Sequence, residues 1–268
     1  MIVELEQDLK LYVYTGGEQY VTGQPFICFV HGASMDHTVW TLFARYWAKR
    51  GYNIASIDLP GHGQSSGEPP ETIEASAEIV CRLMNKLAQG SGVHWVGHSM
   101  GSLVALECAR RAEHSSNLVM LGTGYPMKVG KPLLESSKAN EQVAIDIVSL
   151  FGHSFGAQLG GNPVAGVHAQ TLAERLMEQA GDHVMYKDMY ACHTYDGGEQ
   201  AAAAVSCPVG LILGELDMMT PVRAAESLIN NFSQPEVIRL SDCGHMMMSE
   251  KPELTHRALR QCIEAAAG

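Results

Sequence analysis

The sequence predicts an α/β protein in which helices cover both faces of a mostly parallel, eight-stranded sheet. Short apolar stretches of strand length alternate along the chain with longer amphipathic stretches of helical period. Residues 26–30 are apolar at every position, as in strands that a parallel sheet buries on both faces. The alternation is interrupted over residues 122–206, and this interruption predicts an inserted helical lid.

The strands are expected where apolar stretches end in turn residues. Two opening strands are followed by a turn at Gly16-Gly17, and the third strand ends at His31-Gly32. The stretches of strand length are residues 2–6, 10–15, 26–30, 53–57, 93–96, 118–121, 209–213 and 236–240.

The core helices are expected between these strands. The clearest one ends at Gly90, because Ile79, Leu83 and Leu87 recur every four residues on one face. Another begins at Thr220-Pro221, with Thr220 as N-cap and proline at the first helical position. The remaining core helices are expected over residues 38–49, 102–111 and 252–267.

Residues 122–206 contain no convincing buried strand. Amphipathic patterns predict helices over 141–151, 168–180 and 182–195. The loop between the first two contains turn residues at Gly156, Gly160, Gly161, Pro163 and Gly166. The expected division is therefore a core of residues 1–121 and 207–268 and a lid of residues 122–206.

Composition excludes several classes of function. The 268 residues carry 18 basic and 29 acidic side chains, a net charge of -11, which repels nucleic acid and anionic membranes. The first residues lack the pattern of a signal peptide, and no apolar run approaches the roughly 20 residues of a membrane span. Seven scattered cysteines without metal-ligand spacing predict free thiols in the cytoplasm. Neither a metal nor a cofactor is expected, and oligomeric state is left open.

Residues 97–101 read Gly-His-Ser-Met-Gly, the G-x-S-x-G pattern of a nucleophile elbow, between an expected strand and an expected helix. A sharp turn there forces Ser99 into a strained backbone conformation. Side chains at Gly97 and Gly101 would collide with the neighbouring helix and strand. The pattern therefore predicts an exposed Ser99 hydroxyl that acts as a nucleophile.

A serine nucleophile needs a base. With this type of elbow, the acid and the histidine follow the serine in that order, after late strands. Asp217 comes four residues after Leu213, and His245 follows the last strand, so both are expected at the carboxyl edge of the sheet. Glu215 and Asp242 are alternatives to Asp217; Asp242 lies too close to His245 in sequence to approach its ring easily.

Attack on a carbonyl also needs donors for the negative oxygen that forms. The expected donors are the backbone N–H of Met100, next to the nucleophile, and that of Ala33, after the strand ending at Val30. His31 is interpreted as a structural residue of that loop. Methionines flank the expected catalytic segments, and Met218 and Met246 are candidates for an apolar substrate pocket, although they suit an ordinary core equally well.

Five segments together resemble the α/β-hydrolase superfamily, in particular its bacterial esterase, enol-lactonase and cofactor-free haloperoxidase-like group. They are HGASMDHTVW (31–40), DLPGHGQSSG (58–67), GHSMG (97–101), GELDMMTP (214–221) and GHMMMSEKP (244–252). The resemblance implies the α/β-hydrolase fold, a lid over the site that carries substrate choice, and a structural role for Asp58 and His62. Serine at position 99 argues against the dehalogenase and epoxide hydrolase relatives, which carry aspartate there.

The predicted function is hydrolysis of an ester or lactone of a small, largely apolar molecule through an acyl-enzyme on Ser99. Two alternatives stay open. The same three residues serve hydrolysis of a carbon–carbon bond in a ring-cleavage diketone, and a non-enzymatic ligand receptor could retain all three.

Overall fold

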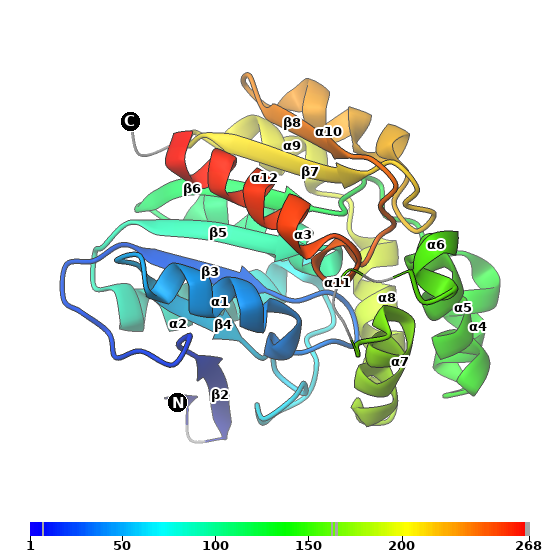
Figure 1. The fold of residues 1–268 in the computed structure, drawn as a ribbon. Helices are drawn as coiled ribbons and strands as arrows, with labels where there is room; N and C mark the ends of the chain where they lie inside the picture. Colours follow the sequence, from blue (N-terminus) through cyan, green and yellow to red (C-terminus); the bar gives the residue numbers. More distant parts are fainter. Residues whose placement is uncertain (7, 162, 164–165, 266–268) are drawn as a thin grey trace.

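A computed structural model describes residues 1–6, 8–161, 163 and 166–265. In this part of the chain, eight strands form one sheet in the order β1-β2-β4-β3-β5-β6-β7-β8 (Figure 1). The two pairings among β1, β2 and β4 are antiparallel, and all the others are parallel. The strands are β1 (Ile2–Glu6), β2 (Leu9–Tyr14), β3 (Phe26–Val30), β4 (Asn53–Ile57), β5 (Val93–His98), β6 (Ser115–Leu121), β7 (Val209–Gly214) and β8 (Glu236–Leu240). The predicted α/β architecture is confirmed.

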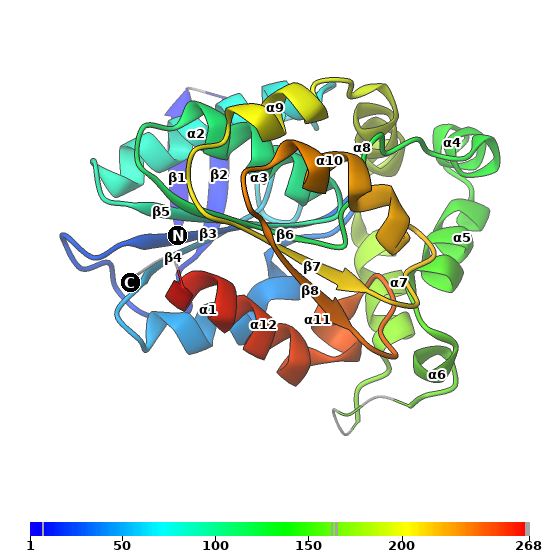
Figure 2. The same cartoon turned by 90° about the horizontal axis from the view of Figure 1, so that it is seen from above.

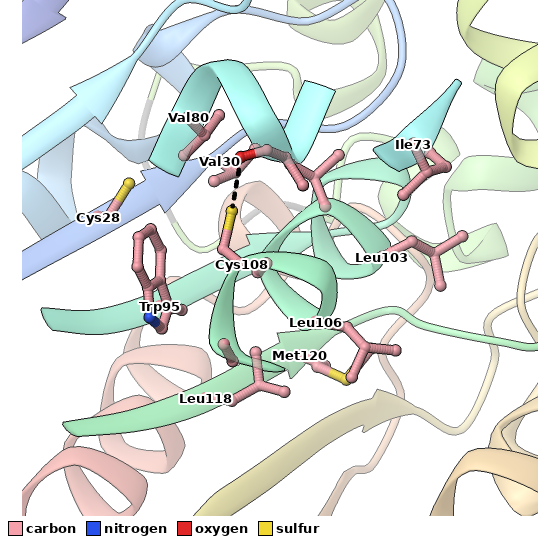
Figure 3. Packing of buried hydrophobic residues seen from close by; sticks show 14 of the residues in the cluster. Cys28, Val30, Ile73, Val80, Trp95, Leu103, Leu106, Cys108, Leu118 and Met120 are labelled. Carbon is pink, nitrogen blue, oxygen red and sulfur yellow. Dashed lines mark hydrogen bonds between the residues drawn. The ribbon is translucent and has the colours of Figure 1, made fainter. Parts of the chain in front are cut away.

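Helices cover both faces of the sheet, as Figure 2 shows from above. One face is covered by α2 (Ile73–Ala88), α3 (Met100–Arg111), α9 (Gly198–Ala204) and α10 (Glu226–Asn231), and the other by α1 (Thr41–Ala48), α11 (Met247–Glu250) and α12 (Pro252–Ala265). Two short 3₁₀ helices, η1 (His37–Trp40) and η2 (Val222–Ala225), precede α1 and α10. Figure 3 shows the core between the sheet and α3, where Leu103, Leu106 and Cys108 pack near Trp95 and Leu118.

Between β6 and β7 the chain forms a group of helices beyond the carboxyl ends of the parallel strands (Figure 1). We call this group the cap: α4 (Lys131–Lys138), α5 (Gln142–Gly152), α6 (Phe155–Gln158), α7 (Ala169–Gln179) and α8 (Val184–Thr194). Buried side chains from four of these helices, α4, α5, α7 and α8, form a cluster with Met35 and Met246 of the core. The last helix of the inserted segment, α9, packs instead against α3 and α10, so the cap is smaller than the segment 122–206.

Several elements differ from the sequence-based expectation. The expected helix 38–49 begins as η1, which Asp36 caps by accepting a hydrogen bond from the Thr38 amide at 2.8 Å. Helices α4, α6, α9 and α11 were not expected, because they are short or lack an amphipathic pattern. The expected helix 252–267 ends at Ala265 in α12; residues 266 and 267 lie outside the described residues. None of the described helices combines the length and apolar character needed to cross a membrane.

Candidate active site

Ser99 lies at the turn between β5 and α3 with backbone angles φ 53° and ψ −122°. A non-glycine residue adopts a positive φ only when its surroundings enforce it. Gly97 and Gly101 make this turn possible. A Cβ on Gly97 would lie 2.0 Å from the Gly101 carbonyl oxygen, and one on Gly101 would lie 2.4 Å from the carbonyl oxygens of Val30 and His31. The expected collisions with helix and strand are therefore present at both positions.

Asp217 follows β7, and His245 follows β8. The imidazole Nδ1 of His245 lies 2.8 Å from Oδ2 of Asp217, and both residues are buried. Burial raises the pKa of Asp217, but its hydrogen bonds and the charge of His245 outweigh burial, so the pKa is lowered overall. The carboxylate only accepts hydrogen bonds, so Nδ1 of His245 carries a proton, and Nε2 is the ring nitrogen available as a base.

Thr220 supports the same carboxylate, a role that sequence reasoning missed. Its hydroxyl donates to Oδ2 of Asp217 at 2.8 Å and lies 3.2 Å from Nδ1 of His245. Its amide donates to Oδ1 at 2.7 Å, and the Met219 amide does so at 2.8 Å. The prediction that Thr220 is a helix N-cap is wrong: Pro221 holds that position before η2, and no side chain caps it. The Thr220 hydroxyl donates its hydrogen bond to the nearby Asp217 carboxylate instead.

His98 connects the turn that holds Ser99 to the loop between β8 and α11 (residues 241–246), which we call the histidine loop. Its Nε2–H donates to the His245 carbonyl at 2.9 Å, and the centroids of the two rings are 4.6 Å apart. Burial and the neighbouring His245 lower the pKa of His98 to about 3, so its ring is neutral. Among the described residues, no hydrogen bond joins the Ser99 hydroxyl to the His245 ring. Such bonds often tighten only when substrate binds.

Sheet register accounts for the proximity of these segments. Val30 pairs with Gly97, His98 with Leu121, and Gly214 with Leu240. The loops after five neighbouring strands, β3, β5, β6, β7 and β8, therefore start at the same edge. The alternative acids Glu215 and Asp242 are both exposed, whereas Asp217 is buried.

The two expected oxyanion donors belong to segments that meet at Ser99. Met100 is the first residue of α3. Ala33 lies in the loop after β3, where a Cβ on Gly32 would come within 3.3 Å of the Ser99 Cβ. Neither the Ala33 nor the Met100 amide donates a hydrogen bond to any other described residue, so both are available to a bound oxygen.

The side chains of His31 and Asp58 form hydrogen bonds with backbone groups of the surrounding loops. The Nδ1–H of His31 donates to the Gly32 carbonyl at 2.8 Å, and its Nε2 accepts from the Leu59 amide at 3.1 Å. Burial and the nearby His62 lower the pKa of His31 to about 4. Asp36, His37 and Asp58 each have an atom that could bind a metal ion, and these atoms lie within 4.8 Å of one another. Asp58, however, already accepts hydrogen bonds from the His37 amide and ring and from the Gln64 amide.

The histidine loop is fastened to the cap. The Met246 amide donates to the Gly152 carbonyl at 3.0 Å. The buried Glu250 carboxylate accepts from the Gly244 amide and from the Ser154 amide, each at 3.2 Å. Both neighbours of His245 in the chain are thus joined to the segment that links α5 to α6.

A cavity of about 440 Å³ opens beside Ser99, between the core and the cap. Most of its lining side chains are apolar, among them Met127, Val129, Leu133, Ile147, Phe151, Met189, Met218 and Met219. Of the two methionines singled out from the sequence, Met218 lines this cavity. Met246 lines a second, smaller cavity of about 210 Å³ between α1 and α7.

The chain is similar to known proteins in both sequence and fold. The pimeloyl-[acyl-carrier protein] methyl ester esterase of Aromatoleum aromaticum is 27% identical over 244 residues, which cover 86% of this chain and 94% of that protein. The enzyme of the same name from Methylococcus capsulatus is 33% identical over 124 residues, only 46% of this chain and 44% of that protein. The solved structure of the enol-lactonase from Burkholderia xenovorans superposes with a TM-score of 0.82 at 18% identity, covering 96% of this chain and 97% of that one.

The similarity to that structure shows a shared fold. A family model also matches the sequence of this chain. The model described as "Alpha/beta hydrolase family" matches residues 29–258. This range spans most of the chain and includes Ser99, Asp217 and His245. The protein therefore belongs to the alpha/beta hydrolase family.

Proposed function

We propose that the protein is a serine hydrolase that cleaves a carboxylic ester or lactone of a small, largely apolar substrate. The observation that carries this proposal is the buried 2.8 Å contact between His245 and Asp217, at the sheet edge that also holds Ser99 in its strained turn. This combination supplies a base with a fixed tautomer beside an activatable hydroxyl.

In the proposed reaction, the Ser99 Oγ attacks the carbonyl carbon while Nε2 of His245 takes its proton. The amides of Ala33 and Met100 bind the negative oxygen, and each such donor contributes roughly 3–4 kcal/mol of transition-state stabilisation. The carbon–oxygen bond then breaks, and His245 returns the proton to the leaving alcohol. Water hydrolyses the acyl-enzyme by the same steps, which releases the acid and restores the Ser99 hydroxyl.

The cavity supports an apolar substrate. Lys128 is the one lining residue with a charged side chain in the described cavity, and its ammonium group donates to the His193 carbonyl at 2.7 Å. The remaining surface matches a hydrocarbon or aromatic group better than a polar one. Two relatives whose names specify an ester bond, described above, favour ester chemistry over carbon–carbon cleavage. The seven cysteines are free thiols, which supports the further proposal of a cytoplasmic location.

The test is a panel of p-nitrophenyl esters, lactones and a ring-cleavage diketone, run on the wild type, Ser99→Ala and Ser227→Ala. Ser227 lies on α10, away from the cavity, and provides the matched control. We expect ester or lactone turnover in the wild type and Ser227→Ala, and loss in Ser99→Ala. Fluorophosphonate should label Ser99 stoichiometrically. Turnover of the diketone alone would replace the proposal with carbon–carbon hydrolysis, and no turnover or labelling would favour a receptor.

A further inference from the structure

A buried carboxylate of the cap contacts the loop that carries an expected oxyanion donor. Asp188 on α8 is 3% exposed. Its Oδ2 accepts a hydrogen bond from the Ser34 amide at 2.8 Å and another from Nε2 of His62 at 2.8 Å. Ser34 directly follows Ala33. One cap oxygen therefore holds the peptide unit next to the Ala33 amide.

The hydrogen bonds of His62 fix its charge. Its Nδ1 lies 3.0 Å from the Pro60 carbonyl oxygen, and its Nε2 lies 2.8 Å from Asp188. Both partners are acceptors, so both ring nitrogens must carry a proton, and the ring is an imidazolium. Burial lowers the pKa of His62, but the charge and hydrogen bond of Asp188 outweigh burial and raise it overall.

The other titratable groups that face this pair are consistent with one positive and one negative charge. The His31 ring lies 4.8 Å from the His62 ring, and its lowered pKa keeps it neutral. Asp58 lies earlier in the same loop as His62, and its carboxylate already accepts hydrogen bonds from the amides of His37 and Gln64. His62 is thus the immediate partner that compensates the buried charge of Asp188, because an unpaired carboxylate there would be costly.

The loop itself needs such an anchor. Ser34 has a φ of 56°, in the left-handed region that costs a non-glycine residue roughly 1–2 kcal/mol. On the other side of Ala33, the ring of His31 accepts from the Leu59 amide. The Ala33 amide therefore lies between two anchors, one from the core and one from the cap.

We propose that Asp188 and His62 are positioning residues that hold the Ala33 N–H toward the negative oxygen of the acyl-transfer reaction. Neither residue touches the reacting atoms; they act through Ser34. The inference rests on the proposed function, and it makes transition-state stabilisation depend on the seating of cap helix α8. One part of this inference does not depend on any substrate: Asp188 holds residues 31–36 in an ordered conformation.

The experiment compares Asp188→Ala and Asp188→Asn with Glu107→Gln. Glu107 is an equally buried carboxylate that accepts from the Tyr195 hydroxyl at 2.6 Å, but it pairs with arginines of α3 and not with the oxyanion loop. Asparagine at position 188 retains an acceptor for Ser34 without the charge. Melting temperature, kcat and KM for p-nitrophenyl acetate, and amide hydrogen exchange of residues 31–36 are measured for each.

Removal of a whole oxyanion donor lowers kcat by about 10²–10³-fold. We therefore expect Asp188→Ala to lower kcat by about 10- to 100-fold with KM little changed, and Asp188→Asn to lower it less. Exchange at residues 31–36 should accelerate in Asp188→Ala and not in Glu107→Gln. A folded Asp188→Ala with wild-type kcat and exchange would overturn the inference, as would equal effects in Glu107→Gln.

The exchange measurement keeps this inference separate from the proposed function. If the wild type hydrolyses no ester but Asp188→Ala still accelerates exchange at residues 31–36, the proposed reaction fails while the positioning role stands. If the wild type is active and the exchange and kcat of both Asp188 variants match it, the positioning role fails alone. Should Asp188→Ala not fold, Asp188→Asn and His62→Asn provide the same comparison.

Discussion

The Nδ1 of His245 lies 2.8 Å from Oδ2 of Asp217, although the two residues are separated by 28 positions in the chain. The strands that precede them, β7 and β8, are parallel neighbours, with Gly214 paired to Leu240. Both loops therefore leave the sheet at the same level. The short turn after β7 carries the Asp217 carboxylate, the longer turn after β8 carries the His245 ring, and the two groups meet. Four experiments test what this geometry and the elbow imply.

Asp217→Asn should leave the fold intact and lower kcat on the order of 10⁴-fold, because an amide no longer fixes the tautomer of His245. The amide also loses the negative charge that stabilises the imidazolium. Ester hydrolysis under saturating substrate measures the effect, with circular dichroism as the check on folding. Asp242→Asn, at an exposed alternative acid, should keep wild-type kcat. An Asp217→Asn enzyme with most of its activity would reject this assignment.

Thr220→Val preserves the shape of the side chain and removes its hydroxyl from Asp217. Hydrogen bonds to charged groups contribute about 1.5–3 kcal/mol. We expect a loss of about 2 kcal/mol in the free energy of unfolding and a decrease in kcat of about 10-fold. Urea denaturation and ester kinetics measure the two effects. Thr194→Val removes an exposed hydroxyl that bonds only to carbonyls of its own helix, and its effect should stay within about 0.5 kcal/mol.

Gly101→Ala tests the close contact of α3 with the end of β3. The new Cβ would lie 2.4 Å from two backbone oxygens, those of Val30 and His31, which cannot move away as a flexible side chain would. We expect a destabilisation of at least about 3 kcal/mol, measured by thermal unfolding. Gly156→Ala adds a methyl group where no atom lies within 4 Å, so its change should remain within about 1 kcal/mol. Similar melting temperatures for the two variants would contradict this packing.

His98 should make the fold sensitive to acid. Its pKa is lowered to about 3 in the folded protein, compared with about 6.5 in an unfolded chain. Between these values only the unfolded chain binds the proton, so stability falls as pH falls. At pH 5 the loss relative to pH 8 is on the order of 2 kcal/mol for this residue. His98→Asn cannot titrate, so urea unfolding at the two pH values should show a smaller loss; an unchanged loss would refute the assignment.

The sequence alone was sufficient to predict those features in which a local residue pattern reflects a local structural constraint. Residues 26–30 and 53–57 form strands as expected, because burial on both faces leaves a recognisable run of residues. The elbow at Ser99 was recognisable because its strained turn requires glycines at fixed spacing. Chain order then placed Asp217 and His245 after late strands, and the structure brings these two together.

Other features depend on contacts that no local pattern records. Thr220 has the sequence context of an N-cap, yet its hydroxyl bonds to a carboxylate that the sheet holds nearby. His62 and Asp188 are 126 positions apart, and neither belongs to a motif that predicts the other. The alanine-rich α9 lacks an amphipathic pattern, and its packing on α3 and α10 became evident only in three dimensions.

The cap is attached to the loop after β3 and to the loop after β8, which has a consequence for protein engineering. Asp188 bonds to Ser34, and Gly152 bonds to Met246, so a chimera that receives a foreign cap would lose both joints unless the donor supplies equivalent groups. Replacing only side chains that face the cavity, such as Ile147 or Leu133, leaves these joints untouched. Redesign of substrate preference should therefore begin with point substitutions rather than with exchange of the whole segment.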